Sequence, residues 1–200
     1  MSRASRTRAL IRSGDLGRIV SCQVMYNIHH SEPVAKRYPG VVRQILTHNA
    51  YIQSYLVSAT RRVVAMKACL HYADFRGEDI AIVQMELASG ALAHFTASFA
   101  ADDHSADPWI VMIKVIGTAS SARYSYRDWV ELKPGLAHSQ TYSAYQGSID
   151  NEVVDFVHNC LQRGEAPLST LDDAIAAQRL IAAIELSIAE QRVVELPPPR

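Results

Sequence analysis

The side chains best suited to chemistry gather in the segment AADDHSADPW, residues 100–109. Asp103 and His104, next to Asp102, have the character of ligands for a hard metal ion. His94 lies on the strand expected before them. Neither H-E-x-x-H nor another recognised metal spacing occurs, so we expect no metal site. Because the segment follows a strand end, Asp103, His104 and Trp109 are instead predicted to bind substrate, with Trp109 as a stacking wall for a sugar. The alternative is a loop that is simply polar.

Other catalytic arrangements have weaker support. Eight histidines allow Ser/His/Asp sets to be assembled, but no G-x-S-x-G turn is present to single one out. The cysteines are isolated and lack C-x-x-C spacing, which argues against a zinc site or a disulfide framework. They are Cys22, Cys69 and Cys160. A reducing cytoplasm fits this cysteine usage best.

The sequence also lacks the usual means of holding a dinucleotide. Such folds open with a strand that feeds a G-x-G-x-x-G turn, where backbone approaches the pyrophosphate at a helix N-terminus. No G-x-G occurs in this sequence. The segment Gly14–Gly17 follows an Arg-rich helical stretch and is predicted to be a helix stop and a turn. We therefore expect this chain alone to bind no nicotinamide cofactor.

Composition favours one ordinary domain over residues 1–200. With 200 residues and 48% hydrophobic content, the chain can bury about 70% of the surface of its unfolded form. Twenty basic residues balance twenty acidic ones, so no global field attracts nucleic acid or an anionic membrane. No apolar run approaches the ~20 residues needed to span a bilayer. The Arg-rich opening is predicted to be a solvated helix face, with a transit peptide or a phosphate-binding arm as alternatives.

Hydrophobic periodicity predicts an α+β fold. Helices are expected at Arg6–Ser13 and Val41–Val57. Consecutive strands with short links indicate an open, largely antiparallel sheet, with Ala88–Gly90 as a hairpin connection. In the strand of residues 91–99, small and aromatic residues alternate with polar ones, which predicts a half-polar sheet. The predicted strands are Arg18–Asn27, Val63–Tyr72, Ile80–Leu87, Ala91–Phe99, Ile110–Ile116, Arg123–Tyr126 and Trp129–Leu132.

Two amphipathic helices are predicted toward the end of the chain. The first runs from Ser148, its N-cap, to Gly164, its stop. Its apolar residues at helical spacing are Ile149, Val153, Phe156, Val157 and Cys160. The second begins at Ser169–Thr170, with two aspartates near its positive end, and ends near Arg192. Its predicted buried stripe is Ala177, Ile181, Ile184 and Ile188.

Three segments of the chain together resemble one protein family. They are the opening ALIRSGDLGRIVSCQV (residues 9–24), the turn KVIGTASSARYSY (114–126) and the closing run from Asn151 to Leu196. In this order they resemble the C-terminal domain of the glucose-fructose oxidoreductase, inositol dehydrogenase and rhizopine catabolism (Gfo/Idh/MocA) family. Each segment alone is a weak signal, but the three occur in the family's order and spacing, and the resemblance extends over essentially all 200 residues.

The resemblance implies a fold, a cofactor and partners. Members have a Rossmann domain that binds NAD or NADP, followed by an α/β domain with an open sheet and helices packed on one face. The chain resembles only this second domain, and the family's E-K-P segment has no counterpart here. By resemblance, the complete enzyme uses NAD or NADP, takes a sugar or polyol substrate, needs a Rossmann domain in cis or trans, and forms a homo-oligomer through the sheet face.

The resemblance also points to a site on the helix within GVVRQILTHNAYIQ (residues 40–53). The family places a carboxylate and an imidazole one turn apart as D-x-x-x-H, where the histidine accepts the hydroxyl proton. The matching imidazole is His48, but Gln44 stands at the carboxylate position and Tyr51 replaces a later acid. His48 is the expected catalytic residue, and Gln44, Asn49 and Tyr51 are expected substrate ligands.

Two other functions stay open from the sequence. Because Gln44 cannot stabilise an imidazolium as an aspartate would, the chain is alternatively a non-catalytic oligomerisation or regulatory module, with His48 as a packing residue. A lyase or hydrolase that uses His48 or His104 on the same scaffold is a third interpretation, supported only by the availability of ligands.

Overall fold

The computed structural model describes residues 3–100, 109–125 and 149–198. They form a seven-stranded sheet in the order β6-β5-β1-β4-β3-β2-β7. The strands are β1 (Ile19–Ile28), β2 (Thr60–Ala68), β3 (Ile80–Leu87), β4 (Leu92–Ser98), β5 (Trp109–Gly117), β6 (Ser121–Ser125) and β7 (Val194–Glu195). Every neighbouring pair is antiparallel except β1 with β4, which confirms the predicted open, largely antiparallel sheet.

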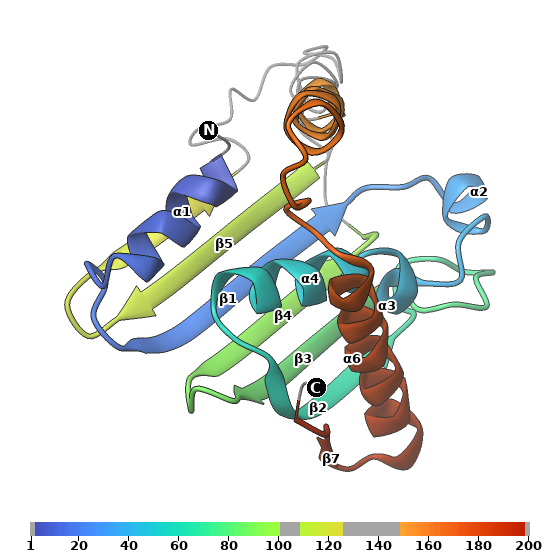
Figure 1. Cartoon of the computed structure of the whole chain (residues 1–200). Coiled ribbons are helices and arrows are strands. Elements are labelled where there is room, and N and C mark those ends of the chain that lie inside the picture. The colour runs from blue at the N-terminus through green and yellow to red at the C-terminus, as the bar shows by residue number, and fades with distance from the viewer. Residues whose placement is uncertain (1–2, 101–108, 126–148, 199–200) are drawn as a thin grey trace, which may run out of the picture.

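Helices cover one face of this sheet and leave the other open (Figure 1). They are α1 (Arg3–Arg12), α2 (Glu32–Ala35), α3 (Val41–Gln44), α4 (Leu46–Leu56) and α6 (Leu171–Glu190). On β4, Ala93, Phe95 and Ala97 are buried under the helices, whereas Leu92, His94 and Thr96 lie on the open face. This alternation confirms the predicted half-polar sheet.

Most predicted elements shift by a few residues at their ends, and two differ in a way that has a structural cause. The strand expected at Val63–Tyr72 ends at Ala68, because the buried carboxylate of Asp79 accepts the backbone N–H groups of residues 70–72 and bends the chain away. The helix expected at Val41–Val57 is two helices, α3 and α4, which meet at Ile45. The predicted strand at Trp129–Leu132 lies outside the described residues.

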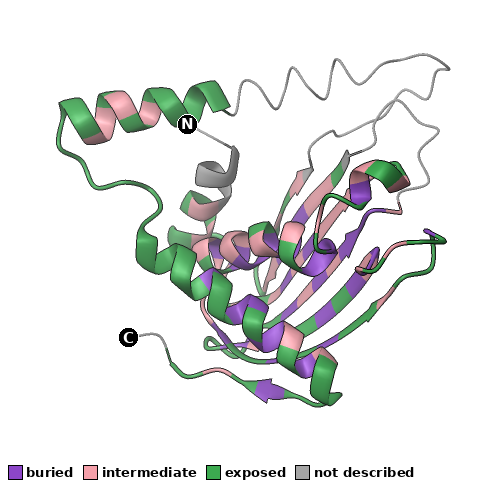
Figure 2. Cartoon of the chain, turned by 90° about the vertical axis from the view of Figure 1, so that its right-hand side faces the viewer, coloured by how far each residue is buried: buried purple, intermediate pink, exposed green. Residues whose placement is uncertain are grey.

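The two closing helices differ in packing. Helix α6 begins with a capping box between Thr170 and Asp173, and its predicted stripe packs against the sheet and α4. Residues 149–162 form a second helix, here called the outer helix, which is α-helical over 149–155 and π-helical over η1 (Phe156–Gln162). Figure 2 shows α6 carrying buried residues, whereas none is buried on the outer helix.

Gly164 ends the outer helix in a left-handed conformation, as predicted. No helix in the described part of the chain is long and apolar enough to cross a membrane.

Candidate functional site

The start of the predicted site helix is held by Glu78. The backbone N–H groups of Val41 and Val42 donate to the Glu78 carbonyl and to its Oε1, each at 3.1 Å. Lys67 Nζ lies 2.8 Å from Glu78 Oε2. Gly40 makes this approach possible, because its φ is +135° and a Cβ there would lie 2.2 Å from Glu78 Oε1. The buried carboxylate therefore fixes where α3 begins.

The end of the site helix is held as firmly. Gln53 is buried, accepts a hydrogen bond of 3.0 Å from Thr60 Oγ1 and donates to the Ser58 carbonyl. These contacts tie the last turn of α4 to the first residue of β2. Between the two ends, Leu46 and Ala50 are fully buried against the sheet. The segment that carries the predicted catalytic residue is thus a rigid support, which is what a positioned proton acceptor requires.

His48 lies on the exposed side of α4, next to the ring of Tyr26 on β1. The two ring centroids are 6.0 Å apart and the planes are inclined by 52°. Neighbouring protein atoms partly desolvate the imidazole, which lowers its pKa below the usual 6.5. Within the described residues, no carboxylate bonds to this ring. The lowered pKa favours the neutral imidazole, the form that can accept a proton.

Gln44 and His48 are not on one continuous helical turn. At the break, the backbone N–H of His48 donates to the Ile45 carbonyl at 3.0 Å. Gln44 is half-buried at the end of α3, and no hydrogen bond joins its side chain to His48 in the described structure. The one-turn spacing implied by the family resemblance is therefore distorted at this point of the chain.

The other two predicted ligands on α4 have different surroundings. Asn49 is fully buried, and both atoms of its side-chain amide lack a hydrogen-bond partner among the described residues. Tyr51 is half-buried and stacks on Tyr55, with ring centroids 5.8 Å apart. The Arg8 guanidinium carbon lies 3.9 Å from the centroid of the Tyr55 ring, so α1 closes this flank. Asn49 thus lies beneath the helix, whereas Tyr51 lies at its side.

The remaining predicted ligands come from the segment before β5. Asp103 and His104 lie outside the described residues. Trp109 begins β5, where its backbone pairs with Ile28 at the end of β1, and its side chain is outside the description. Since Tyr26 lies two residues before Ile28, the sheet brings the backbone of Trp109 to the same end of β1 as His48.

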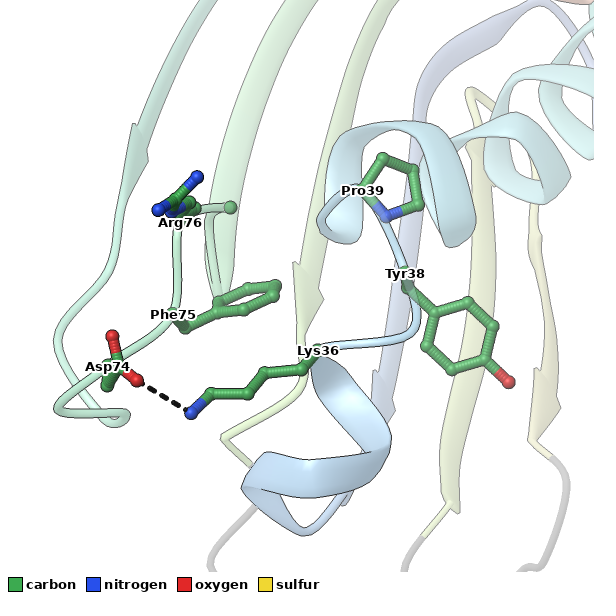
Figure 3. A pocket seen from close by; sticks show the side chains of 7 residues that line it. Lys36, Tyr38, Pro39, Asp74, Phe75 and Arg76 are labelled. Atoms are coloured by element: carbon green, nitrogen blue, oxygen red, sulfur yellow. Dashed lines mark hydrogen bonds and ion pairs between the residues drawn. The ribbon is translucent and has the colours of Figure 1, made fainter.

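Sequence reasoning missed a polar pocket at the end of the sheet. It has a volume of about 380 Å³ and lies beside an aromatic cluster of His30, Tyr38, Phe75 and Phe99. Figure 3 shows Lys36 reaching across it to Asp74, at 2.9 Å. None of the predicted site residues lines it; its lining is Lys36, Tyr38, Pro39, Asp74, Phe75, Arg76 and Gly77. These residues come from two segments that are distant in sequence, so no local sequence pattern predicts the pocket.

A second pocket, of about 400 Å³, lies between α3, β2 and α6. Two ion pairs line it: Lys67 with Glu78, and Arg43 with Glu185, whose Nε and Oε1 lie 2.6 Å apart. Because each of these four charged side chains already has a partner in the chain, we assign this pocket no ligand. It connects the start of the site helix to α6.

The Gly14–Gly17 segment is a turn from a helix into a strand. Gly14 and Gly17 both have positive φ and form the turn between α1 and β1, as predicted from the sequence. They therefore follow a helix and precede a strand, the reverse of a phosphate-binding turn. In the part of the chain that is described, no three His, Cys, Asp or Glu side chains are grouped to hold a metal ion.

Comparison with known proteins identifies the fold. Residues 5–123 match the family described as GFO/IDH/MocA C-terminal domain. A probable dehydrogenase from Thermotoga maritima has a similar structure, with a TM-score of 0.83 and 19% identity over 96% of this chain and 61% of that one. A putative myo-inositol dehydrogenase from Sinorhizobium meliloti gives 0.81 and 21%, over 97% and 62%.

Levoglucosan dehydrogenase, solved in complex with NADH and L-sorbose, is also similar. Its TM-score is 0.76 at 18% identity, over 96% of this chain and 62% of that one. No curated protein matches the sequence. The chain thus spans about three fifths of the length of the solved structures that it resembles.

Proposed function

The chain belongs to the GFO/IDH/MocA C-terminal domain family, and from this premise we propose that it is the substrate-binding and oligomerisation domain of an NAD(P)-dependent oxidoreductase. The substrate class is a sugar, a cyclitol or a related polyol, oxidised at a hydroxyl group. The observation that carries this proposal is the position of His48, on the exposed side of a helix that hydrogen bonds hold at both ends.

In this proposal His48 accepts the proton of the substrate hydroxyl at a ring nitrogen. A lowered pKa keeps the imidazole unprotonated and ready at neutral pH, although it also makes the ring a weaker base. Gln44 and Tyr51 supply polar groups that can bind neighbouring hydroxyls, and Asp103, His104 and Trp109 complete the site. Asn49 contributes less, because its amide is buried beneath the helix.

The hydride acceptor, NAD or NADP, belongs to a nucleotide-binding domain joined in cis or supplied in trans. Support comes from levoglucosan dehydrogenase with NADH, and from the fact that this chain spans only part of that enzyme. Because the turn at Gly14 and Gly17 does not fit a pyrophosphate, we assign no cofactor-binding residue in the described chain.

Self-association is proposed to use the open face of the sheet. Apolar side chains that belong to no core are exposed there, including Met66 at 77% and Leu92 at 62%. Met66 and Ile82 are cross-strand neighbours, and exposed apolar residues that lie side by side are typical of an interaction site. The other exposed members are Val64, Ile82 and Ile110.

One observation favours the alternative of a non-catalytic module. His48 has no carboxylate partner among the described residues, and Gln44 stands where the family carries the acid, so nothing in view stabilises an imidazolium. In that case the sheet and the helices serve assembly or regulation of a full-length relative. His48 then has only a packing role against Tyr26.

Ligand binding by the purified chain tests the proposal. We expect NMR shifts at α4 with millimolar myo-inositol or L-sorbose, and no binding of NAD⁺ or NADP⁺ by calorimetry. His48→Ala should reduce the sugar-induced shifts, whereas Met66→Glu on the open face should leave them intact. Tight dinucleotide binding by the chain alone would contradict the proposal. Sugar-induced shifts that survive His48→Ala unchanged would favour the non-catalytic module.

A further inference from the structure

The polar pocket at the end of the sheet, here called the end pocket, combines charged groups with an aromatic wall. Its volume of about 380 Å³ falls within the range of about 300–1,000 Å³ that small-molecule sites occupy. Asp74 and Arg76 line it from the segment between β2 and β3, and Lys36 lines it from the segment between α2 and α3. None of these side chains belongs to the proposed site around His48.

Hydrogen bonds hold the first of these two segments in place. The fully buried carboxylate of Asp79 accepts the backbone N–H groups of residues 70–72 and so fixes the turn that precedes Asp74. The backbone N–H of Asp74 donates to Glu32 Oε1 at 3.0 Å, which ties this segment to the opposite wall. A pocket whose polar groups are held in this way needs little reorganisation to bind a ligand.

The two walls meet closely at Gly77. A Cβ at this position would lie 2.7 Å from the Phe75 ring and 2.7 Å from the Pro39 carbonyl oxygen, so any side chain there would force the walls apart. Figure 3 shows the Phe75 ring pointing from its own segment toward the one that carries Lys36 and Pro39. Phe75 also packs against Phe99, with ring centroids 6.3 Å apart. An apolar ring is thus held beside the charged groups.

The charges of the end pocket are only partly paired. Lys36 Nζ lies 2.9 Å from Asp74 Oδ2 and 3.3 Å from Glu32 Oε1, so the lysine has two carboxylate partners. Arg76 is exposed and forms no ion pair with any residue that the structure describes. The Asp74 carboxylate keeps free acceptor positions, because Lys36 alone among the described side chains bonds to it. The pocket therefore offers an unpaired guanidinium and a carboxylate that can accept further hydrogen bonds.

We propose that the end pocket binds a sugar acid, a monosaccharide that carries one carboxylate. The Arg76 guanidinium matches that carboxylate in a bidentate pair. Asp74 accepts hydrogen bonds from sugar hydroxyls, and the Phe75 ring packs against the apolar C–H side of the sugar. A phosphate dianion fits less well, because the Asp74 carboxylate in the same pocket repels it.

The end pocket is separate from the proposed site at His48. His48 lies against Tyr26 on β1, whereas the end pocket lies beside His30, which stacks on Tyr38 and is four residues further along the chain. Four extended residues span about 13 Å, more than the width of one sugar ring. A single sugar acid in the end pocket therefore does not reach His48, and its binding should leave α4 unperturbed.

Titration of the purified chain with D-glucuronate, followed by NMR and by calorimetry, tests this proposal. We expect a dissociation constant of about 1 mM, with NMR shifts at Lys36 and at residues 74–77. D-glucose, which lacks the carboxylate, should bind at least about tenfold more weakly, because the charged pair with Arg76 is absent. Acetate, which lacks the hydroxyls, should also bind at least about tenfold more weakly, because it leaves Asp74 and Phe75 without a partner.

Two substitutions that remove the same charge make the result specific. Arg76→Gln should reduce the affinity for D-glucuronate to that for D-glucose. Arg37→Gln changes an exposed residue next to Lys36 that does not line the end pocket, so it should leave the binding unchanged. Both arginine side chains are exposed, so neither change should impair folding.

Each other outcome counts against the sugar acid. Equal affinity for acetate or inorganic phosphate and for D-glucuronate would show an unspecific anion site, and an equal loss in both arginine variants would show an effect of net charge alone. No binding of D-glucuronate, or shifts confined to α4 that vanish in His48→Ala, would also overturn the proposal. Shifts at residues 74–77 that survive His48→Ala support it even if myo-inositol and L-sorbose leave α4 unperturbed, so this proposal and the proposed function fail separately.

Discussion

The outer helix and α6 have similar sequence patterns but differ in how far their apolar residues are buried. Both carry apolar residues at helical spacing, and both end close to the residue where the sequence places the stop. Ile184 on α6 is 0% exposed, whereas Phe156 on the outer helix is half exposed. Periodicity therefore predicts that a helix has an apolar face, but what covers that face depends on the rest of the assembly.

Truncating one apolar side chain on each helix tests whether the two helices contribute unequally to stability. Ile184→Ala should lower the free energy of unfolding by about 2–5 kcal/mol, because it leaves a cavity in the core. Phe156→Ala should change it by less than about 0.5 kcal/mol, because the ring contributes little to the folded chain. Urea unfolding measures both. Equal losses would mean that the outer helix is packed in solution.

The comparison can be extended to the site helix through Gly40, the residue that precedes α3. Gly40→Ala places a Cβ against Glu78 Oε1 and also strains a positive φ, so we expect a loss of about 3 kcal/mol. Gly90→Ala is the matched control, because its φ is also positive but nothing lies within 4 Å. It should cost about 1–2 kcal/mol. A Gly40 loss no larger than the Gly90 loss would contradict the tight Glu78 contact.

A smaller effect is expected at the start of α6. Thr170→Ala removes one half of the capping box with Asp173 and should cost about 1 kcal/mol in urea unfolding. Thr170→Ser keeps the hydroxyl and should cost less. If Thr170→Ala had no effect, the cap would add nothing to a helix that is already held by its buried stripe, and the contrast with the outer helix would rest on packing alone.

The smallest effect concerns His48 and pH. Its pKa in the folded chain lies below the usual 6.5, so as pH falls below about 6.5 the unfolded chain takes up the proton first. Stability should therefore fall between that pH and the folded pKa, and this contribution becomes constant at lower pH. His48→Gln should remove it. The difference in urea midpoint between wild type and variant, at about pH 7.5 and about pH 5, isolates His48 from His30, whose pKa is also lowered.

Local patterns predicted most elements well. The strand Ile80–Leu87 has the predicted bounds, and α6 starts at its predicted cap. Strand β7 was missed, because a two-residue pairing with β2 is a tertiary event with no local pattern. The break at Ile45 was also missed, because no glycine or proline marks it in the sequence.

The candidate site was predictable only in part. The family resemblance pointed to His48, and α4 does present this residue beside Tyr26. Nothing in the sequence indicated that Asn49, its immediate neighbour, would face inward with an unpaired amide. The rotation of a helix about its own axis is set by the strands on which it packs, and adjacent residues differ by about 100° in direction.

The position of β1 has a consequence for how the chain is assembled. This strand precedes the other six in sequence, yet its two neighbours in the sheet are β4 and β5. The units on either side, the meander β2–β3–β4 and the hairpin β5–β6, are made of sequence neighbours and can form early, whereas β1 has both of its partners only once Gly117 has been made. The strand β1 thus joins two units that can form before it pairs with both of them. Any domain attached ahead of β1 is tethered to the centre of the sheet.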